Sequence, residues 1–150
     1  MSRQTIIADA SCLIVLQKVQ ELSLLQKLFG EVFITQEVEK EFGLELLEWI
    51  KIIGVKNKIQ QKALNLILDA GEASAIALSL ETNNSLLIID EKKGRRIAQE
   101  LGLKIVGTLG VILQAKENGL IGSIENILEK LENVGFWIFP NLKAKILENE

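Results

Sequence analysis

The chain has 150 residues, a formal net charge of −3 and 48% hydrophobic residues, which fits one ordinary folded domain. It contains no histidine, and this excludes Ser-His-Asp and Cys-His catalysis, histidine general bases and histidine-ligated zinc. Tyrosine is absent as well, so acid–base or metal chemistry must use Asp, Glu, Lys, Ser, Thr or Asn. Ligand sets made only of oxygen favour hard cations such as Mg²⁺ or Mn²⁺.

The apolar segments and the single cysteine bear on where the protein works. No apolar run approaches the roughly 20 residues of a membrane span, and the N-terminal sequence lacks the pattern of a signal peptide. Cys12 has no second cysteine to pair with, and its apolar neighbours predict a buried, inert thiol. We therefore expect a cytoplasmic protein without membrane contact. Because the net charge is −3, any nucleic-acid site would have to be a local basic patch.

Short apolar runs alternate with helical patterns along the chain. Strands are predicted at Thr5–Ala8, Val32–Ile34, 49–55, 85–89 and Lys104–Val106. Helices are predicted at 13–19, 21–29, 35–42 with Thr35 as N-cap, 58–68, 72–81 after a break at Gly71, 91–101, 108–118, Ile124–Asn133 with Ser123 as cap, and 140–147 with Pro140 at its first position. This alternation indicates an α/β fold with a mainly parallel, helix-covered sheet, in a single domain over residues 1–150.

Two of the predicted strands end in aspartate. Asp9 follows TIIA directly, and Asp90 follows SLLII directly. Ligands of open α/β sheets bind beyond the carboxyl ends of the strands, so neighbouring strands would bring both carboxylates to one edge. Glu72, on the buried side of an alanine-rich helix, and Glu41, which borders the inner face of its helix, are candidates to join them.

Each of these acids also has a structural explanation. Asp9 and Asp90 could be helix N-caps, a role that Ser11 could share. A glutamate such as Glu72 is favoured in the first turn by the helix dipole alone, and Glu41 could be one more surface glutamate. The recurrence of aspartate at two apolar strand ends favours a shared site.

The segments that hold these acids resemble the PIN-domain family. They are IIADAS, ITQEVEKEF, GEASAIALSLE and LLIIDEKKGRRIAQELGL, in this order. The continuation IVGTLGVILQAKENGLI is similar to one PIN-like subfamily of bacteria and archaea. The resemblance covers nearly the whole chain, from Ile6 to about Leu147.

The resemblance implies a three-layer α/β/α sandwich and a metal-dependent, single-strand-specific ribonuclease that uses Mg²⁺ or Mn²⁺. It assigns the catalytic acids to Asp9, Glu41, Glu72 and Asp90, and the metal ligands to Asp9, Glu72 and Asp90. Glu91 would be a fifth acid, and Ser11 matches a hydroxyl position near the metal. Glu72 departs from the pattern, because many members have Asp there. The alternative is a noncatalytic PIN-like module that binds RNA or protein.

The resemblance also implies partners, since many prokaryotic PIN domains are toxins neutralised by an antitoxin protein and many are dimers. We expect single-stranded RNA as substrate, with an antitoxin and a homodimer as further partners. The candidate contacts to nucleic acid are Ser11, Lys92, Lys93, Arg95, Arg96 and Thr108, the basic ones from the run EKKGRRIAQ. A solvated helix face is the alternative for the basic run, and an N-cap is the favoured alternative for Thr108.

The apolar stretch GFWIFPNL, residues 135–142, is the last notable segment. Covering the core is the default explanation for it, and an interface with a second copy or an antitoxin is the functional alternative. Other acidic-pocket folds fit less well. A haloacid-dehalogenase-like phosphatase would need Asp at position 11, where this chain has Ser11. A receiver domain would need an acceptor Asp on a middle strand together with a lysine on a late strand, and the two cannot both be matched here. A dinucleotide-binding domain would need its glycine motif after the first strand, and this motif is lacking.

Overall fold

The computed structural model describes residues 3–149. Within them, five strands form one sheet in the order β3-β2-β1-β4-β5, and every pairing is parallel. The strands are β1 Thr5–Ala8, β2 Val32–Ile34, β3 Ile50–Ile52, β4 Ser85–Ile88 and β5 Lys104–Val106. The two central strands, β1 and β4, are almost wholly buried, as continuous apolar runs in a parallel sheet should be.

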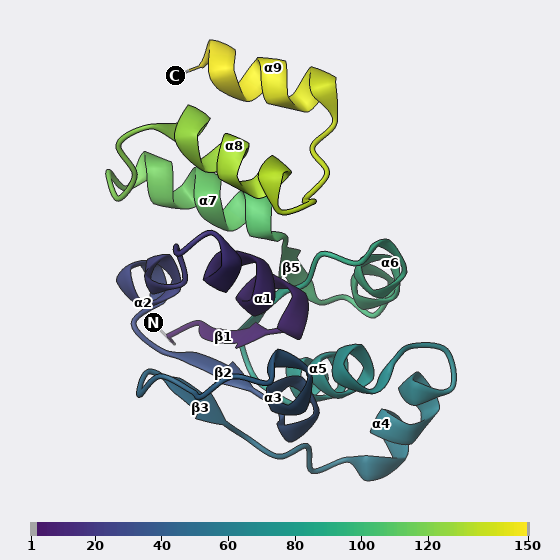
Figure 1. Ribbon diagram of the computed structural model, residues 1–150. Helices are drawn as coiled ribbons and strands as arrows, with labels where there is room; N and C mark the ends of the chain where they lie inside the picture. The colour runs from purple at the N-terminus through teal and green to yellow at the C-terminus, as the bar shows by residue number, and fades with distance from the viewer. Residues whose placement is uncertain (1–2, 150) are drawn as a thin grey trace.

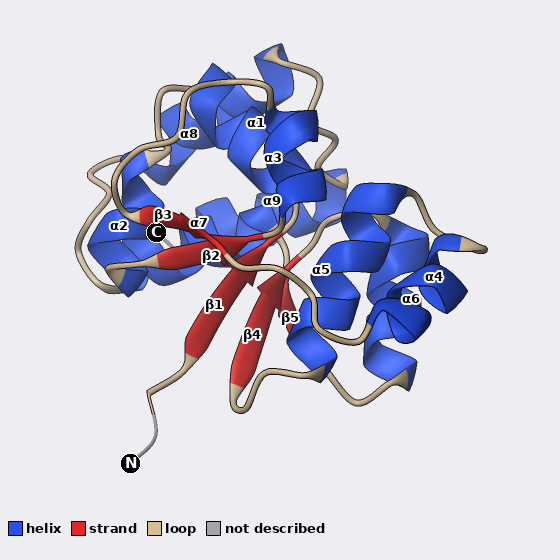
Figure 2. Cartoon of the chain, turned by 90° about the horizontal axis from the view of Figure 1, so that it is seen from below, coloured by secondary structure: helices blue, strands red, loops and turns tan. Residues whose placement is uncertain are grey.

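Helices cover both faces of this sheet. They are α1 Ala10–Lys18, α2 Ser23–Phe29, α3 Gln36–Phe42, α4 Lys58–Asn65, α5 Ala70–Leu80, α6 Lys92–Glu100, α7 Thr108–Glu117, α8 Ile124–Asn133 and α9 Pro140–Glu148. Figure 2 shows α4, α5 and α6 gathered on one side of the strands, with α1, α2, α7 and α8 on the other. The predicted three-layer α/β/α sandwich is therefore confirmed. No helix within residues 3–149 is long and apolar enough to cross a membrane.

The last three helices form a stack beside the sheet, with α9 outermost (Figure 1). Helix α9 has no buried residue. It is held by the half-buried Ile146 and Leu147 and by an ion pair of 2.6 Å between Lys143 Nζ and Glu132 Oε1 of α8. Since an ion pair of this exposure contributes little, α9 is fastened mainly by a narrow apolar contact.

Two predicted caps are confirmed, and one predicted break is wrong. Thr35 accepts a hydrogen bond from the Val38 N–H at 3.1 Å, and Ser123 accepts one from Asn126. Gly71, expected to separate two helices, is instead the second residue of α5. The helix can begin before Gly71 because Asp69 caps it, accepting from the Glu72 N–H at 2.8 Å.

Candidate active site

The carboxyl edge of the sheet brings the two strand-end aspartates together. Strand β1 pairs directly with β4, with Ala8 opposite Ile88, and the Asp9 N–H donates to the Ile88 carbonyl at 2.9 Å. Asp9 and Asp90 therefore leave neighbouring strands on the same edge. This is the arrangement that a shared site required.

Asp9 lies at this edge as a buried acid without a capping role. It occupies the N-cap position of α1, yet its side chain makes no cap hydrogen bond. The side chain is 3% exposed, and its Oδ1 is buried without a hydrogen-bond partner among the described residues. Burial raises the pKa of Asp9 to about 7, with smaller increases from the charges of Glu41, Asp69 and Asp90 and a partial offset from the Ala10 N–H. A cap therefore does not explain this carboxylate.

Glu72 is the second buried acid of the site. It lies in the first turn of α5 and is 7% exposed, and its Oε2 also has no hydrogen-bond partner among the described residues. Burial is the main reason that the pKa of Glu72 is raised to about 9, with further contributions from the carboxyl groups of Asp69 and Glu91 and from the charge of Asp9. Asp9 and Glu72 thus each have one buried oxygen without a hydrogen-bond partner among the described residues.

Glu41 reaches the site from the last turn of α3. Its Oε1 accepts a hydrogen bond from the Gly71 N–H at 3.2 Å, across to the start of α5. The residue as a whole is exposed, but burial of its carboxyl group, followed by the charge of Asp69, raises its pKa. Glu41 is therefore tied to α5 and is not an unattached surface glutamate.

Asp90 differs from Asp9 because both of its oxygens have partners. The Thr108 N–H donates to Oδ1 at 2.7 Å, and the Thr108 hydroxyl donates to Oδ2. Thr108 is not the N-cap of α7, as the sequence had favoured; it is the first helical residue, and Gly107 occupies the cap position. Since Thr108 is fully buried, its hydroxyl fixes Asp90 and does not face a phosphate in solution.

Three of the four predicted acids lie directly against a glycine. A Cβ added to Gly94 would lie 2.7 Å from Glu72 Oε2, and one added to Gly107 would lie 2.9 Å from Asp90 Oδ1. The pairs are Gly71 with Glu41, Gly94 with Glu72, and Gly107 with Asp90. Each distance is shorter than a real Cβ contact, so these glycines provide the room that the carboxylates occupy.

Asp69 belongs to the site although the sequence analysis missed it. It caps α5 through the Glu72 N–H, and its charge raises the pKa values of Asp9, Glu41 and Glu72. The signal was present: Asp69 stands three residues before Glu72, which is the spacing of a helix start. Taking Gly71 as a helix break hid it.

Glu91, the possible fifth acid, is the N-cap of α6. Its Oε2 accepts a hydrogen bond from the Gly94 N–H at 2.7 Å, and this bond is the main reason that its pKa is lowered. Ser11 is exposed in the first turn of α1, two residues beyond Asp9. Glu91 is thus engaged in capping its own helix, whereas Ser11 lies exposed at the start of the helix that follows Asp9.

The donor set fits a hard divalent cation, although the acids do not enclose one as they lie. Within residues 3–149, no three Cys, Asp or Glu side chains converge closely enough to hold a metal ion. The available donors are carboxylate oxygens, and two of them, on Asp9 and Glu72, are buried without partners. A cation such as Mg²⁺ or Mn²⁺ would provide a partner for both oxygens.

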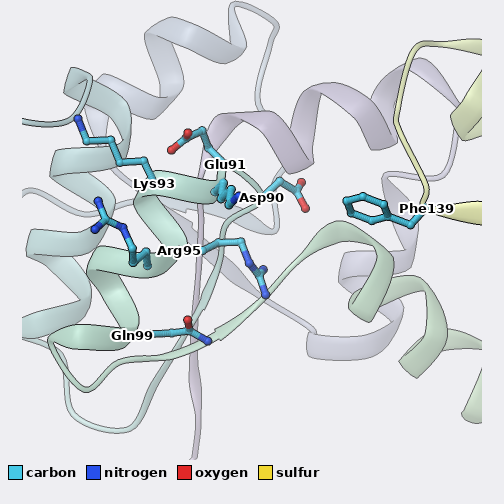
Figure 3. Close-up of a pocket in the computed structure, with 8 residues that line it drawn as sticks. Asp90, Glu91, Lys93, Arg95, Gln99 and Phe139 are labelled. Carbon is cyan, nitrogen blue, oxygen red and sulfur yellow. The ribbon is translucent and has the colours of Figure 1, made fainter. Parts of the chain in front are cut away.

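Beside the acids, α6 lines a cleft of about 960 Å³ (Figure 3). Its lining residues are Asp90, Glu91, Lys92, Lys93, Arg95, Arg96, Gln99 and Phe139. Arg95 is partly engaged, because its Nη1 donates to the Ile89 carbonyl at 2.8 Å, whereas Lys92, Lys93 and Arg96 are exposed. The predicted basic run therefore lies against the acidic edge.

The family comparison agrees with this geometry. Residues 5–150 match the model of the family DUF3368, described as a PIN domain. The chain therefore belongs to the PIN-domain family, whose members are generally nucleases and typically use divalent metal ions. Comparison with curated proteins finds no match.

Proposed function

We propose that this PIN domain is a Mg²⁺- or Mn²⁺-dependent endoribonuclease that cleaves single-stranded RNA. The observation that carries the proposal is the pair of buried carboxylates, Asp9 and Glu72, each with an oxygen that lacks a partner. Burying charged groups without partners is costly, and a divalent cation at this edge would offset that cost. The neighbouring basic cleft supports a nucleic-acid substrate.

The proposed roles follow from the surroundings of each acid. A bound cation would supply charge neutralisation on the phosphate and an activated water. Asp9, Glu72 and Asp90 would hold it, with Asp90 already oriented by Thr108. Of the four proposed catalytic acids, Glu41 is the exposed one and is held by the Gly71 N–H, so it would orient the attacking water. The cations of α6 would hold the RNA backbone.

Cleavage of a single-stranded RNA with Mn²⁺ or Mg²⁺ tests the proposal directly. We expect cleavage by the wild-type protein, none with EDTA, and a loss of at least about 100-fold in Asp9→Asn, because the metal site loses its buried ligand. Glu31→Gln is the matched control, since Glu31 is exposed before β2, away from the carboxyl edge. Equal cleavage by wild type and Asp9→Asn would refute the proposal.

A noncatalytic RNA-binding module is the second candidate. It is favoured by one observation, namely that both oxygens of Asp90 are already occupied by Thr108. A protein of this kind would bind RNA equally well as wild type and as Asp9→Asn, and neither form would cleave it. Binding and cleavage measured on the same RNA separate the two candidates.

We also propose that the ribonuclease acts as the toxin of a toxin–antitoxin pair. This role is supported by the resemblance of the chain to prokaryotic PIN domains, and its consequence is that RNA cleavage arrests growth. Induced expression in a bacterial host should stop growth with the wild-type protein and not with Asp9→Asn at equal abundance. Growth arrest by both forms would contradict the toxin role.

A further inference from the structure

The segment between α8 and α9 presents two aromatic side chains to solvent. Its side chains alternate, as expected of extended chain: Ile138 is buried at 3% exposure, while Trp137 and Phe139 are 70% and 66% exposed. The two rings pack edge to face, with centroids 6.1 Å apart and planes at 79°. Ile138 therefore anchors the segment, and the exposed pair is free to contact a ligand.

Phe139 lies at the junction of two hollows on the surface. One is the basic cleft of about 960 Å³ along α6. The other, of about 540 Å³, is lined by Trp137 and by apolar residues of β5 and α7, and it shares Asp90, Arg95 and Phe139 with the first. Figure 3 shows the Phe139 ring facing the Asp90 side chain. The aromatic pair thus borders the acidic edge directly.

Charge favours a nucleic acid as the occupant of this surface. The cleft beside Phe139 is lined by Lys92, Lys93, Arg95 and Arg96, in a chain whose net charge is −3. Proteins that bind single strands combine a positively charged groove, which follows the phosphates, with aromatic side chains that stack on the bases. Both components are adjacent here, on either side of Asp90.

We propose that Trp137 and Phe139 form a base-stacking platform for single-stranded RNA. The strand lies with its phosphates against α6 and one or two bases on the aromatic pair, and this places a phosphodiester beside Asp90. The inference rests on the proposed function and adds the side chains that hold the substrate. Such a platform would favour single strands, because the bases of a duplex are not free to stack on a protein ring.

Binding of a fluorescein-labelled oligouridine in EDTA tests the platform without cleavage. Phe139→Ala and Trp137→Ala should each weaken binding on the order of ten-fold, which is within the range for one lost base stack. Phe139→Tyr should bind like wild type and Phe139→Leu should not, because the ring and not its hydrophobicity makes the contact. Leu66→Ala is the matched control, since Leu66 is 86% exposed just after α4.

Tryptophan fluorescence gives a second readout. The chain has two tryptophans, so Trp49→Phe leaves Trp137 as the sole reporter. Single-stranded RNA should quench its emission and an RNA duplex should not. Unchanged emission at saturating RNA, or wild-type affinity in both alanine variants, would overturn the proposal.

Salt dependence separates the platform from the basic wall. Arg96→Gln should lower the slope of log Kd against log salt by about 0.7, the value for one lost phosphate contact, whereas Phe139→Ala should leave the slope unchanged. If RNA binding is unaffected by the aromatic substitutions but they convert a wild-type dimer to a monomer, the surface joins two copies and the platform is wrong.

The platform and the ribonuclease fail in different experiments. Metal-dependent cleavage that is unchanged in Trp137→Ala and Phe139→Ala removes the platform and leaves the ribonuclease. RNA binding that depends on both rings, with no cleavage under any metal condition, refutes the ribonuclease and retains the platform.

Discussion

At the scale of single residues, the two strand-end aspartates, Asp9 and Asp90, differ in their surroundings and hydrogen bonds. Asp9 follows β1 at once and is enclosed by the fold, whereas Asp90 stands one residue further from its strand and reaches the first turn of α7. The sequence presents them as equivalents, since each ends an apolar run. Their difference arises from which helix start lies within reach.

Asp9→Asn should stabilise the metal-free protein at high pH. The pKa of Asp9 is raised from 3.8 to about 7 in the folded state, so its contribution to stability is fully present below about pH 3.8 and is lost as pH rises to about 7. At pH 8 with EDTA, the variant should gain up to about 4 kcal/mol in unfolding free energy, and at pH 3.5 almost nothing. Urea denaturation at the two pH values measures this, with Glu31→Gln as control.

Divalent cations should reverse the order of stability of the wild-type protein and Asp9→Asn at pH 8. Mg²⁺ or Mn²⁺ binds the folded wild type and not the unfolded chain, so its melting temperature at pH 8 should rise with metal concentration. Asp9→Asn should show a much smaller rise. A wild-type melting curve that ignores both metals would count against a cation at this edge.

Gly94→Ala should damage the site more than the fold. The new methyl group would overlap Glu72 Oε2 and Ile89 Cδ1 and so displace the carboxylate. Overpacking costs about 1–3 kcal/mol, partly offset by about 1 kcal/mol from the better helix propensity of alanine. We expect RNA cleavage and the metal-induced melting shift to fall sharply. Gly122→Ala, where nothing lies within 4 Å of the added Cβ, should change neither.

At the scale of elements, burial decided what the sequence could predict. Strands β1 and β4 are buried on both faces, so their apolar runs identify them without further information. The start of α5 could not be read in the same way, because Gly71 carries the ordinary signal of a helix end while tertiary contacts with Glu41 require a glycine inside the helix. Gly71, which allows Glu41 to approach the start of α5 closely, was therefore misinterpreted as the end of a helix.

Thr108→Val should loosen the link between β4 and α7. The substitution keeps the shape of the buried side chain but removes the hydroxyl that donates to Asp90. Losing a hydrogen bond to a charged group costs about 1–3 kcal/mol, and Asp90 would keep only the Thr108 N–H. Chemical denaturation should show this loss, together with weaker RNA cleavage. Thr82→Val is the control, since the Thr82 hydroxyl, just after α5, donates to the Leu78 carbonyl in the last turn of that helix and not to an acid of the site.

At the scale of the whole molecule, the strand order explains where the site lies. From β1 the chain moves outward to β2 and β3, and then returns to the other side for β4 and β5. The crevice at such a switch in direction is where open α/β sheets bind ligands, and Asp9 and Asp90 flank it. Both aspartates could be identified as candidates from the sequence, but only the strand order shows that the chain reverses direction between β1 and β4, where they lie.

The narrow attachment of α9 has a consequence for hydrogen exchange. A helix without buried residues opens locally at a lower free energy than the core, so the amides of α9 should exchange before those of α7 and α8. Phe139 immediately precedes this helix, which places an RNA-stacking ring at the edge of the earliest segment to open. Mass spectrometry should find that single-stranded RNA slows exchange in α9 while the buried strands β1 and β4 remain unchanged. RNA binding would then stabilise α9, the outermost helix, against local opening.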